Sequence, residues 1–278
     1  MLSYRHGFHA GNFADVLKHS LLTLAVLALK KKDKPFVYID THAGAGSYSL
    51  TSTFAEKTGE YREGIGRLWH CKEPHPLAQH YLDAVRSFNS GQLVHYPGSP
   101  ALVRALIRSQ DRMQLSELHS ADFTHLSHLY RNDPRVSVSQ EDGLKNLKKK
   151  LPPVQKRGLV LIDPSYEIKD DYVSAVATLA EAHRRFATGI YGLWYPVIDR
   201  DSAENLMRNV KATGIRRQLR IEHCVIPDAS GRGMTGSGLV FINPPWQLDV
   251  QAGNLLPWLN QCLSDDLGSW RVEWLIQE

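Results

Sequence analysis

An apolar run that stops at an acidic residue is the strongest constraint on the fold of this chain. Residues 158–162 read Gly-Leu-Val-Leu-Ile and lead directly into Asp163-Pro164-Ser165-Tyr166. A short, unbroken apolar run predicts a strand that is buried on both faces, as in the middle of a parallel α/β sheet. Open α/β sheets bind their ligands at the carboxyl ends of the strands, so we expect Asp163 at a ligand site.

The residues after this strand suit one kind of ligand. Pro164 fixes its own φ angle and stiffens the turn, so its carbonyl is held in place as a hydrogen-bond acceptor. Asp163 is a second acceptor, and Tyr166 adds an aromatic face. Two acceptors and a ring fit a planar base with an exocyclic amine, so these three residues are our candidate catalytic residues. Asp-Pro turns are also common without any catalytic role, so the assignment depends on the rest of the chain.

The other strands expected from the sequence alternate with helical patterns. They cover residues 36–40, 113–117, 135–139 and 190–194. This alternation predicts an α/β fold with a parallel sheet. Residues 218–226 and 238–243 have strand patterns with no helix between them, which predicts a closing antiparallel hairpin. A parallel sheet with such a hairpin is the seven-stranded, Rossmann-like sheet of class I S-adenosylmethionine-dependent methyltransferases.

One segment interrupts the alternation after the first strand. Residues 50–110, approximately, have helical apolar spacing at 76–88 and 100–107, with Ser99 expected as the N-cap of the second helix. The apolar residues of this segment are too few for an independent core. We therefore expect a single methyltransferase domain over residues 1–278 that carries a small helical insertion subdomain.

Acidic residues follow the expected parallel strands. They are Asp40, Glu117, Asp142 and Asp163, and a glycine-rich turn follows the first of them. Parallel strands share a direction, so these ends should gather along one edge of the sheet. S-adenosylmethionine suits such an edge, because carboxylates bind the ribose hydroxyls and the adenine amine and lie near the positive sulfonium. A nicotinamide dinucleotide is disfavoured, because the third glycine of its fingerprint is missing.

Motifs along nearly the whole chain resemble the RlmJ family of 23S ribosomal RNA adenine-N6 methyltransferases. They are Tyr4–His6, His9–Asn12, Lys18–His19, Asp40–Gly46, Gly59–Tyr61, Tyr96–Pro100, Asp163–Tyr166, Leu193–Pro196, Arg232–Thr235 and Asn243–Trp246. The resemblance implies S-adenosylmethionine as cofactor and 23S ribosomal RNA as partner. It also implies cofactor contacts at His19, His42, Ser99, Glu117, Asp142, Gly143 and Asp163, and an RNA contact at Tyr4.

Two motifs need separate comment. Adenine-N6 enzymes of this type usually read Asp-Pro-Pro-Tyr, whereas this chain has Ser165 at the third position. Serine leaves the turn looser, which affects efficiency more than chemistry. Asn243-Pro-Pro-Trp246 matches the same pattern better, but it follows an antiparallel strand and should point away from the cofactor edge. We therefore expect it to be structural, with Trp246 packed nearby.

Composition limits the remaining possibilities. The net charge of +4 and three basic clusters, at residues 145–157, 184–185 and 216–220, favour a polyanionic partner, although each cluster alone also suits a solvated surface. Three dispersed cysteines indicate neither a disulfide framework nor a zinc site, and the histidines lack a ligand-pair motif, so we expect no metal. No signal peptide or membrane segment is evident, which predicts a cytoplasmic protein that is not bound to membranes. We expect a monomer, although the sequence leaves the oligomeric state open.

Two other functions stay open from the sequence alone. One is a DNA adenine-N6 methyltransferase, although the insertion is small for a target-recognition region. The other is a noncatalytic nucleic-acid-binding protein, in which Ser165 marks lost catalysis and which is linked, by resemblance, to the use of external DNA.

Overall fold

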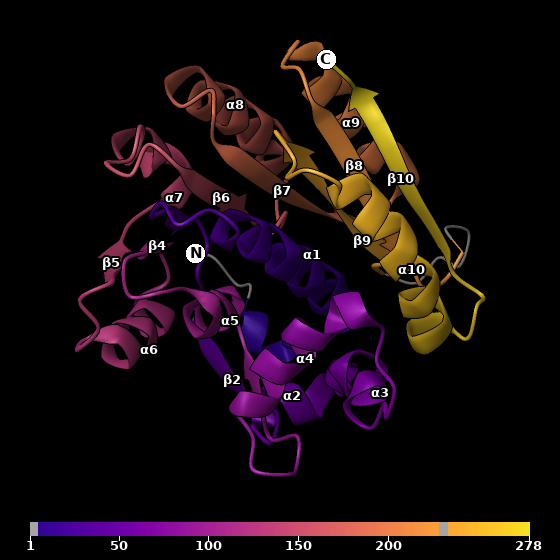
Figure 1. Ribbon diagram of the computed structural model, residues 1–278. Helices are drawn as coiled ribbons and strands as arrows, with labels where there is room; N and C mark the ends of the chain where they lie inside the picture. The colour runs from indigo at the N-terminus through magenta and orange to yellow at the C-terminus, as the bar shows by residue number, and fades with distance from the viewer. Residues whose placement is uncertain (1–4, 228–232) are drawn as a thin grey trace.

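The computed structural model describes residues 5–227 and 233–278. Its main strands are β1 (Val37–Asp40), β4 (Arg112–Glu117), β5 (Val136–Gln140), β6 (Gly158–Ile162), β7 (Ile190–Val197), β8 (Gln218–Cys224), β9 (Gly236–Ile242) and β10 (Ser269–Ile276). Within the described residues, these strands form one eight-stranded sheet in the order β10-β8-β9-β7-β6-β1-β4-β5 (Figure 1).

The strand directions confirm the expected α/β fold class. Strands β5, β4, β1, β6 and β7 are parallel, and β9 runs antiparallel to both β7 and β8. The prediction of seven strands was wrong, because β10 adds an eighth strand by pairing antiparallel with β8. This strand lies at one edge of the sheet, beside β8 (Figure 1).

Helices cover both faces of the sheet (Figure 1). One face is covered by α1 (Phe13–Lys30), α4 (Pro76–Ser87), α5 (Ser99–Leu106) and α10 (Leu248–Ser264), and the other by α7 (Gly143–Asn146), α8 (Asp170–Arg185) and α9 (Arg200–Ala212). In β6, Leu159 and Leu161 join the core under α1, and Val160 and Ile162 join the core under α8. Burial on both faces explains why β6 is apolar throughout. None of the helices that the structure describes is both long and apolar enough to cross a bilayer.

The segment after β1 holds more than helices. It contains α2 (Thr53–Thr58), α3 (Ile65–Trp69) and α4, together with a small antiparallel sheet of β2 (Ser47–Ser49) and β3 (His95–Pro97). Its buried side chains, such as Leu50 and Leu68, belong to the same core as α1. Ser99 is not the N-cap of α5 as expected, since Gly98 has that position and Ser99 is the first helical residue.

Short elements complete the chain. Helix α6 (Ser120–Tyr130) packs beside β5, and the described residues also contain the 3-10 helices η1 (His6–Phe8), η2 (Glu60–Glu63) and η3 (Leu147–Lys149). Asn12 caps α1 as the sequence predicts, because its side chain accepts a hydrogen bond from the backbone N–H of Asp15.

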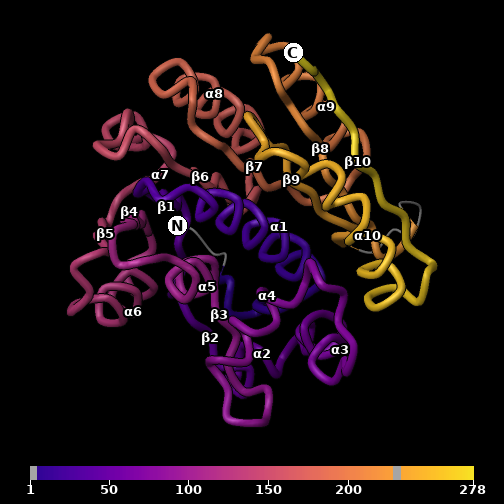
Figure 2. Tube along the Cα trace, in the orientation of Figure 1, coloured from indigo at the N-terminus to yellow at the C-terminus, as the bar shows by residue number. Residues whose placement is uncertain are grey.

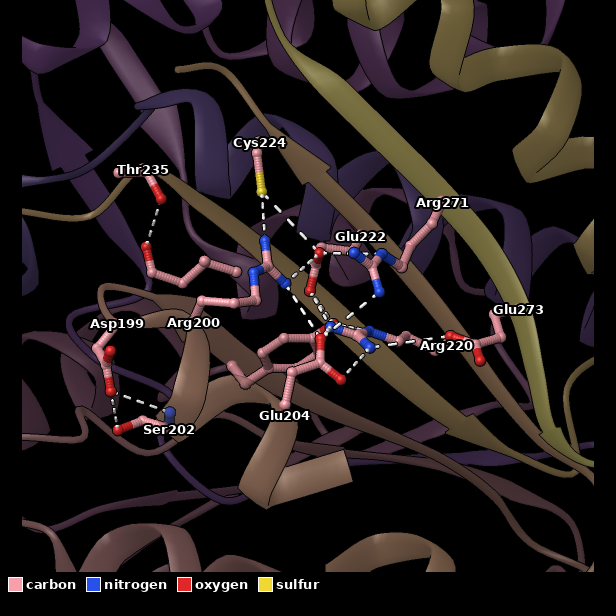
Figure 3. Close-up of polar contacts among 12 residues, drawn as sticks. Asp199, Arg200, Ser202, Glu204, Arg220, Glu222, Cys224, Thr235, Arg271 and Glu273 are labelled. Atoms are coloured by element: carbon pink, nitrogen blue, oxygen red, sulfur yellow. Dashed lines mark hydrogen bonds and ion pairs between the residues drawn. The ribbon is translucent and has the colours of Figure 1, made fainter. Parts of the chain in front are cut away.

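A buried ion network joins α9 to β8 and β10 (Figure 3). The guanidinium of Arg220 is 1% exposed and pairs with Glu204 at 2.8 Å and with Glu222 at 2.7 Å. Arg200 and Arg271 also pair with Glu222, at 2.8 and 3.4 Å. Each buried charge therefore has an opposite charge beside it, which offsets the cost of removing it from water.

Candidate active site

A cavity of about 370 Å³ lies at the carboxyl edge of the parallel strands. Its wall combines the start of α1 with residues at or after the ends of β1, β4, β5, β6 and β7. This is where an open α/β sheet binds its ligands, and the volume suits a small cofactor. Of the residues expected at the site, His19, His42, Ser99, Glu117, Asp142, Gly143, Asp163 and Pro164 all line this cavity.

Asp163 pairs with Lys18, which the sequence places in a motif but does not connect with Asp163. Lys18 Nζ lies 2.7 Å from Asp163 Oδ2 and 3.0 Å from Asp15 Oδ1. Asp15 is 2% exposed and also accepts from His6 Nε2 at 2.9 Å. Burial opposes the charge of Asp15, yet the neighbouring His6 and Lys18 side chains hold the pKa of Asp15 well below its usual range. No local signal indicates the Lys18 pair, because its partner is 145 residues away.

Asp40 is turned away from the cavity, against our expectation that all four strand-end acids line it. Its carboxylate is fully buried and accepts from Ser99 Oγ at 2.6 Å, Tyr38 Oη at 2.6 Å and the backbone N–H of His42 at 3.1 Å. Burial raises the pKa of Asp40. Asp40 therefore positions Ser99 and His42, which do line the cavity.

Glu117 joins two loops of the site. Its Oε2 accepts from the backbone N–H of Gly44 at 2.7 Å, and its Oε1 accepts from that of His119 at 2.7 Å. Burial raises the pKa of the Glu117 carboxyl. Gly44 has φ +60°, a conformation in which glycine carries no steric penalty.

Asp142 begins helix α7, and Gly143 approaches the loop after β1 very closely. Asp142 caps α7 by accepting from the backbone N–H of Lys145, and it pairs with Lys145 Nζ at 3.0 Å. Burial opposes the charge, but these contacts with Lys145 keep the pKa of Asp142 below its usual value. A Cβ atom on Gly143 would lie 2.0 Å from the carbonyl oxygen of Thr41, so only glycine fits here.

Tyr166 does not present an open ring. It is 7% exposed, its hydroxyl donates to the carbonyl of Trp194 at 2.6 Å, and its ring packs on Tyr172 with centroids 4.4 Å apart. Trp194 lines the cavity instead, with Lys18 Nζ 5.5 Å from its ring centroid. In this conformation, stacking of a base on Tyr166 would require the loop after Pro164 to move, and its catalytic role stays a prediction.

The second amine-methyltransferase motif lies at the opposite edge of the sheet. It follows β9, which is antiparallel to β7, and none of its residues lines the cavity. The side chain of Asn243 donates to the carbonyls of Ala187 at 2.8 Å and Gly189 at 2.9 Å. The prediction that Trp246 packs nearby was wrong, because its side chain is 82% exposed.

Two expectations have no structural outcome. Tyr4 and Arg232, the first residue of the Arg232–Thr235 motif, lie outside the described residues. Across residues 5–227 and 233–278, no three histidine, cysteine or acidic side chains are placed to share a metal ion.

Comparison with known proteins identifies the family. Residues 33–276 match the family model described as ribosomal RNA large subunit methyltransferase D, RlmJ. The chain belongs to the RlmJ family. It is 52% identical to ribosomal RNA large subunit methyltransferase J of Escherichia coli and 49% identical to that of Haemophilus influenzae, with all of each chain covered. A crystal structure of a Legionella pneumophila protein is 38% identical, covers 96% of this chain and 98% of its own, and superposes with a TM-score of 0.90.

Membership of the RlmJ family confirms the expectation of a ribosomal RNA methyltransferase that uses S-adenosylmethionine. The residues present fit that cofactor. His19 is 1% exposed, its Nδ1 is 2.7 Å from Tyr96 Oη, and its Nε2 has no hydrogen-bond partner among the described residues. Burial lowers the pKa of His19 to about 3, so the ring is neutral. An unpartnered, neutral imidazole nitrogen in the wall of an acidic cavity suits the polar end of the cofactor.

Proposed function

We propose that this protein transfers a methyl group from S-adenosylmethionine to N6 of an adenine in 23S ribosomal RNA, acting as a monomer in the cytoplasm. The observation that carries the proposal is the place of Asp163 and Pro164. Both lie at the end of β6, in the cavity that also holds Glu117, Asp142 and Gly143. Asp163 and the Pro164 carbonyl, the two proposed acceptors for the adenine amine, thus lie in the same cavity as the residues proposed to bind the cofactor.

We assign each residue expected to bind the cofactor to the part of S-adenosylmethionine that its side chain suits. We assign the ribose hydroxyls to Glu117, whose two oxygens already accept backbone N–H groups and keep further lone pairs. Asp142, at the end of β5, is assigned to the adenine amine, beside the backbone of Gly143. His19, His42 and Ser99 border the methionine part, as the family resemblance implies. When bound, the cofactor supplies the electrophilic methyl group.

Asp163 and Pro164 prepare the amine. The N6 lone pair of adenine is delocalised into the ring, so the amine is a poor nucleophile until both its hydrogens are held. The Pro164 carbonyl accepts one hydrogen and Asp163 accepts the other. Lys18 occupies Asp163 Oδ2, which leaves Oδ1 to face the base. Asp163 then accepts the proton that the amine loses during or after methyl transfer.

The test is mass spectrometry of nucleosides from 23S ribosomal RNA transcribed in vitro and incubated with protein and isotopically labelled S-adenosylmethionine. We expect label in N6-methyladenosine with wild-type protein, and labelling slower by about 10²-fold or more with Asp163→Ala. Label in a different nucleoside would overturn the adenine-N6 assignment. Cofactor binding by calorimetry without any labelled nucleoside would support the noncatalytic alternative.

A further inference from the structure

The amino edge of the sheet, opposite the cavity, gathers loops that are far apart in the sequence. The strand pairing brings the starts of β1, β6, β7 and β8 and the end of β9 to this edge, since the pairs are Val37 with Gly158, Leu159 with Ile190, Tyr191 with Ile242, and Ile242 with Gln218. The start of β8 and the end of β10 meet at this edge, beside the C-terminus (Figure 2). The segments that precede β1, β6, β7 and β8, and the segment that follows β9, must therefore lie along this edge.

Hydrogen bonds fasten these loops to one another. Arg157 donates to the carbonyl of Lys34 at 2.7 Å and to that of Leu29 at 2.6 Å, which joins the β6 loop to the end of α1. Asn243 bonds the loop before β7, and its backbone N–H donates to the carbonyl of Arg217 at 3.1 Å. The edge is therefore a fixed surface with a defined arrangement of side chains.

Exposed cations lie along this edge. They are Lys31, Lys32, Lys34, Lys156 and Arg216, and we call them, with Trp246, the amino-edge surface. None of the five cations forms a salt bridge with a described residue. Nearby acids are largely engaged elsewhere, since Asp33 pairs with Arg108 at 3.6 Å and Glu181 pairs with both Arg184 and Arg185. Glu278, at the C-terminus, is the remaining exposed acid beside Arg217. The surface therefore has an excess of positive charge.

Trp246 adds an aromatic ring to these cations. Asn243 has φ +51° and commits its side chain to two carbonyls, which sets the direction of the Pro244-Pro245 turn and leaves the indole of Trp246 82% exposed. Val250, the third residue of α10, is also exposed, at 56%. An exposed ring on the same edge as unpaired cations is typical of a nucleic-acid contact, in which phosphates bind the cations and a base stacks on the ring.

We propose that the amino-edge surface binds structured ribosomal RNA outside the target adenine. Lys34 precedes β1 and Arg216 precedes β8, and these strands are four spacings apart in the sheet, a span of about 19 Å, which is enough for several phosphates. The strands place this surface about 16 Å from the cavity edge, with helices on both faces between them. An RNA must therefore extend around the helices on one face of the sheet to contact both the cavity and the amino-edge surface. The inference rests on the proposed function, since it names a second contact for the same substrate.

The experiment compares a long 23S ribosomal RNA fragment with a short stem-loop that carries the target adenine. We expect Lys32→Glu/Arg216→Glu to raise KM for the long fragment about tenfold and leave kcat unchanged, and to leave both constants unchanged for the stem-loop. Trp246→Ala should raise KM for the long fragment about fivefold or more, as expected for loss of one stacking ring. The matched control is Lys57→Glu/Lys72→Glu, which makes the same change of charge at two exposed positions in the insertion between β1 and β4, away from this edge.

Any result other than these would overturn the proposal. An unchanged KM for the long fragment, or an equal rise for the control, excludes a specific contact at this edge. A rise with the stem-loop as well places the effect at the cavity. If sedimentation shows a wild-type dimer that Trp246→Ala dissociates, a second copy of the chain covers this surface. Failure of the proposed function is distinguishable, because no RNA would then be methylated, while gel-shift affinities for the two RNAs would still report on the surface.

Discussion

At the scale of single residues, Asp163 is the side chain on which the proposed chemistry depends most. Asp163→Ala removes the oxygen that holds the amine, so we expect kcat to fall about 10²-fold or more. The comparison is Asn243→Ala, assayed with the short stem-loop, for which kcat should stay within a few-fold because Asn243 lies at the opposite edge of the sheet. Equal losses in the two variants would mean that the wrong motif had been assigned.

Ser165 is the departure from the family pattern, and it lines the cavity. Proline at this position would stiffen the turn that carries Pro164 and Tyr166. Ser165→Pro should therefore keep kcat or raise it, measured at saturating RNA and cofactor. A wild-type protein without activity that Ser165→Pro restores would instead support the noncatalytic alternative.

His19 predicts a pH dependence of stability. Its folded pKa, about 3, lies below the ordinary value of 6.5, so its contribution is complete above pH 6.5 and is lost as the pH falls toward 3. Between pH 7 and pH 5 the free energy of unfolding should fall by about 2 kcal/mol more in wild type than in His19→Gln. Urea denaturation at both pH values measures this, with His70→Gln at an exposed position as control. Equal pH dependence in wild type and His19→Gln would contradict a neutral, buried His19.

At the scale of elements, the ion network around Arg220 fastens β10 and α9 to the sheet (Figure 3). Arg220→Ala leaves Glu222, which is 3% exposed, without its closest cation. A buried charge left without any partner costs about 3–5 kcal/mol of stability, so with Arg200 and Arg271 still beside Glu222 we expect a loss near the lower end of that range. Arg184→Ala breaks an exposed pair with Glu181 and should cost much less, because water already screens that pair. Chemical denaturation distinguishes the two, and similar small losses would show that the network is not tightly coupled.

Some elements were predictable from the sequence because a short run of residues shows which of their side chains are buried. The apolar runs of β1 and β6 indicate strands buried on both faces, and Asn12 indicates the start of α1. Strand β10 was missed although Trp270, Val272, Trp274 and Ile276 alternate with polar residues over most of its length. Its alternation reflects an edge strand with much of its surface exposed, which differs from the continuous apolar runs of the central strands.

The site was predictable only in part, for a physical reason. The residues at strand ends follow from topology, because parallel strands end at one edge. The side-chain contacts depend on packing between distant segments. Lys18 meets Asp163 across 145 residues, and Tyr166 is buried because Tyr172 and Trp194 pack against it. Neither contact has a local pattern that would indicate it.

At the scale of the whole molecule, the two edges of the sheet differ in charge. The cavity edge carries Glu117, Asp142 and Asp163, which suit a cationic cofactor, and the amino edge carries the exposed lysines. RNA affinity should therefore fall steeply as salt rises, because phosphate contacts release counterions, while cofactor affinity should change little. Filter binding and calorimetry over 50 to 200 mM salt, with cofactor and RNA measured separately, provide the comparison. Equal salt dependence for the two ligands would contradict this division of charge.

The position of the cavity at the carboxyl edge also predicts the class of nucleic acid that is methylated. The target adenine has to enter the cavity edge, and extrusion from a duplex costs a few kcal/mol, least where the base is already unpaired. A loop or junction adenine in RNA is therefore favoured over an adenine in duplex DNA. The measurement is a side-by-side assay of 23S ribosomal RNA fragments and adenine-containing duplex DNA at one salt concentration. N6-methyladenine in the duplex and none in the RNA would make DNA the substrate, while the fold and the role of Asp163 would be unaffected.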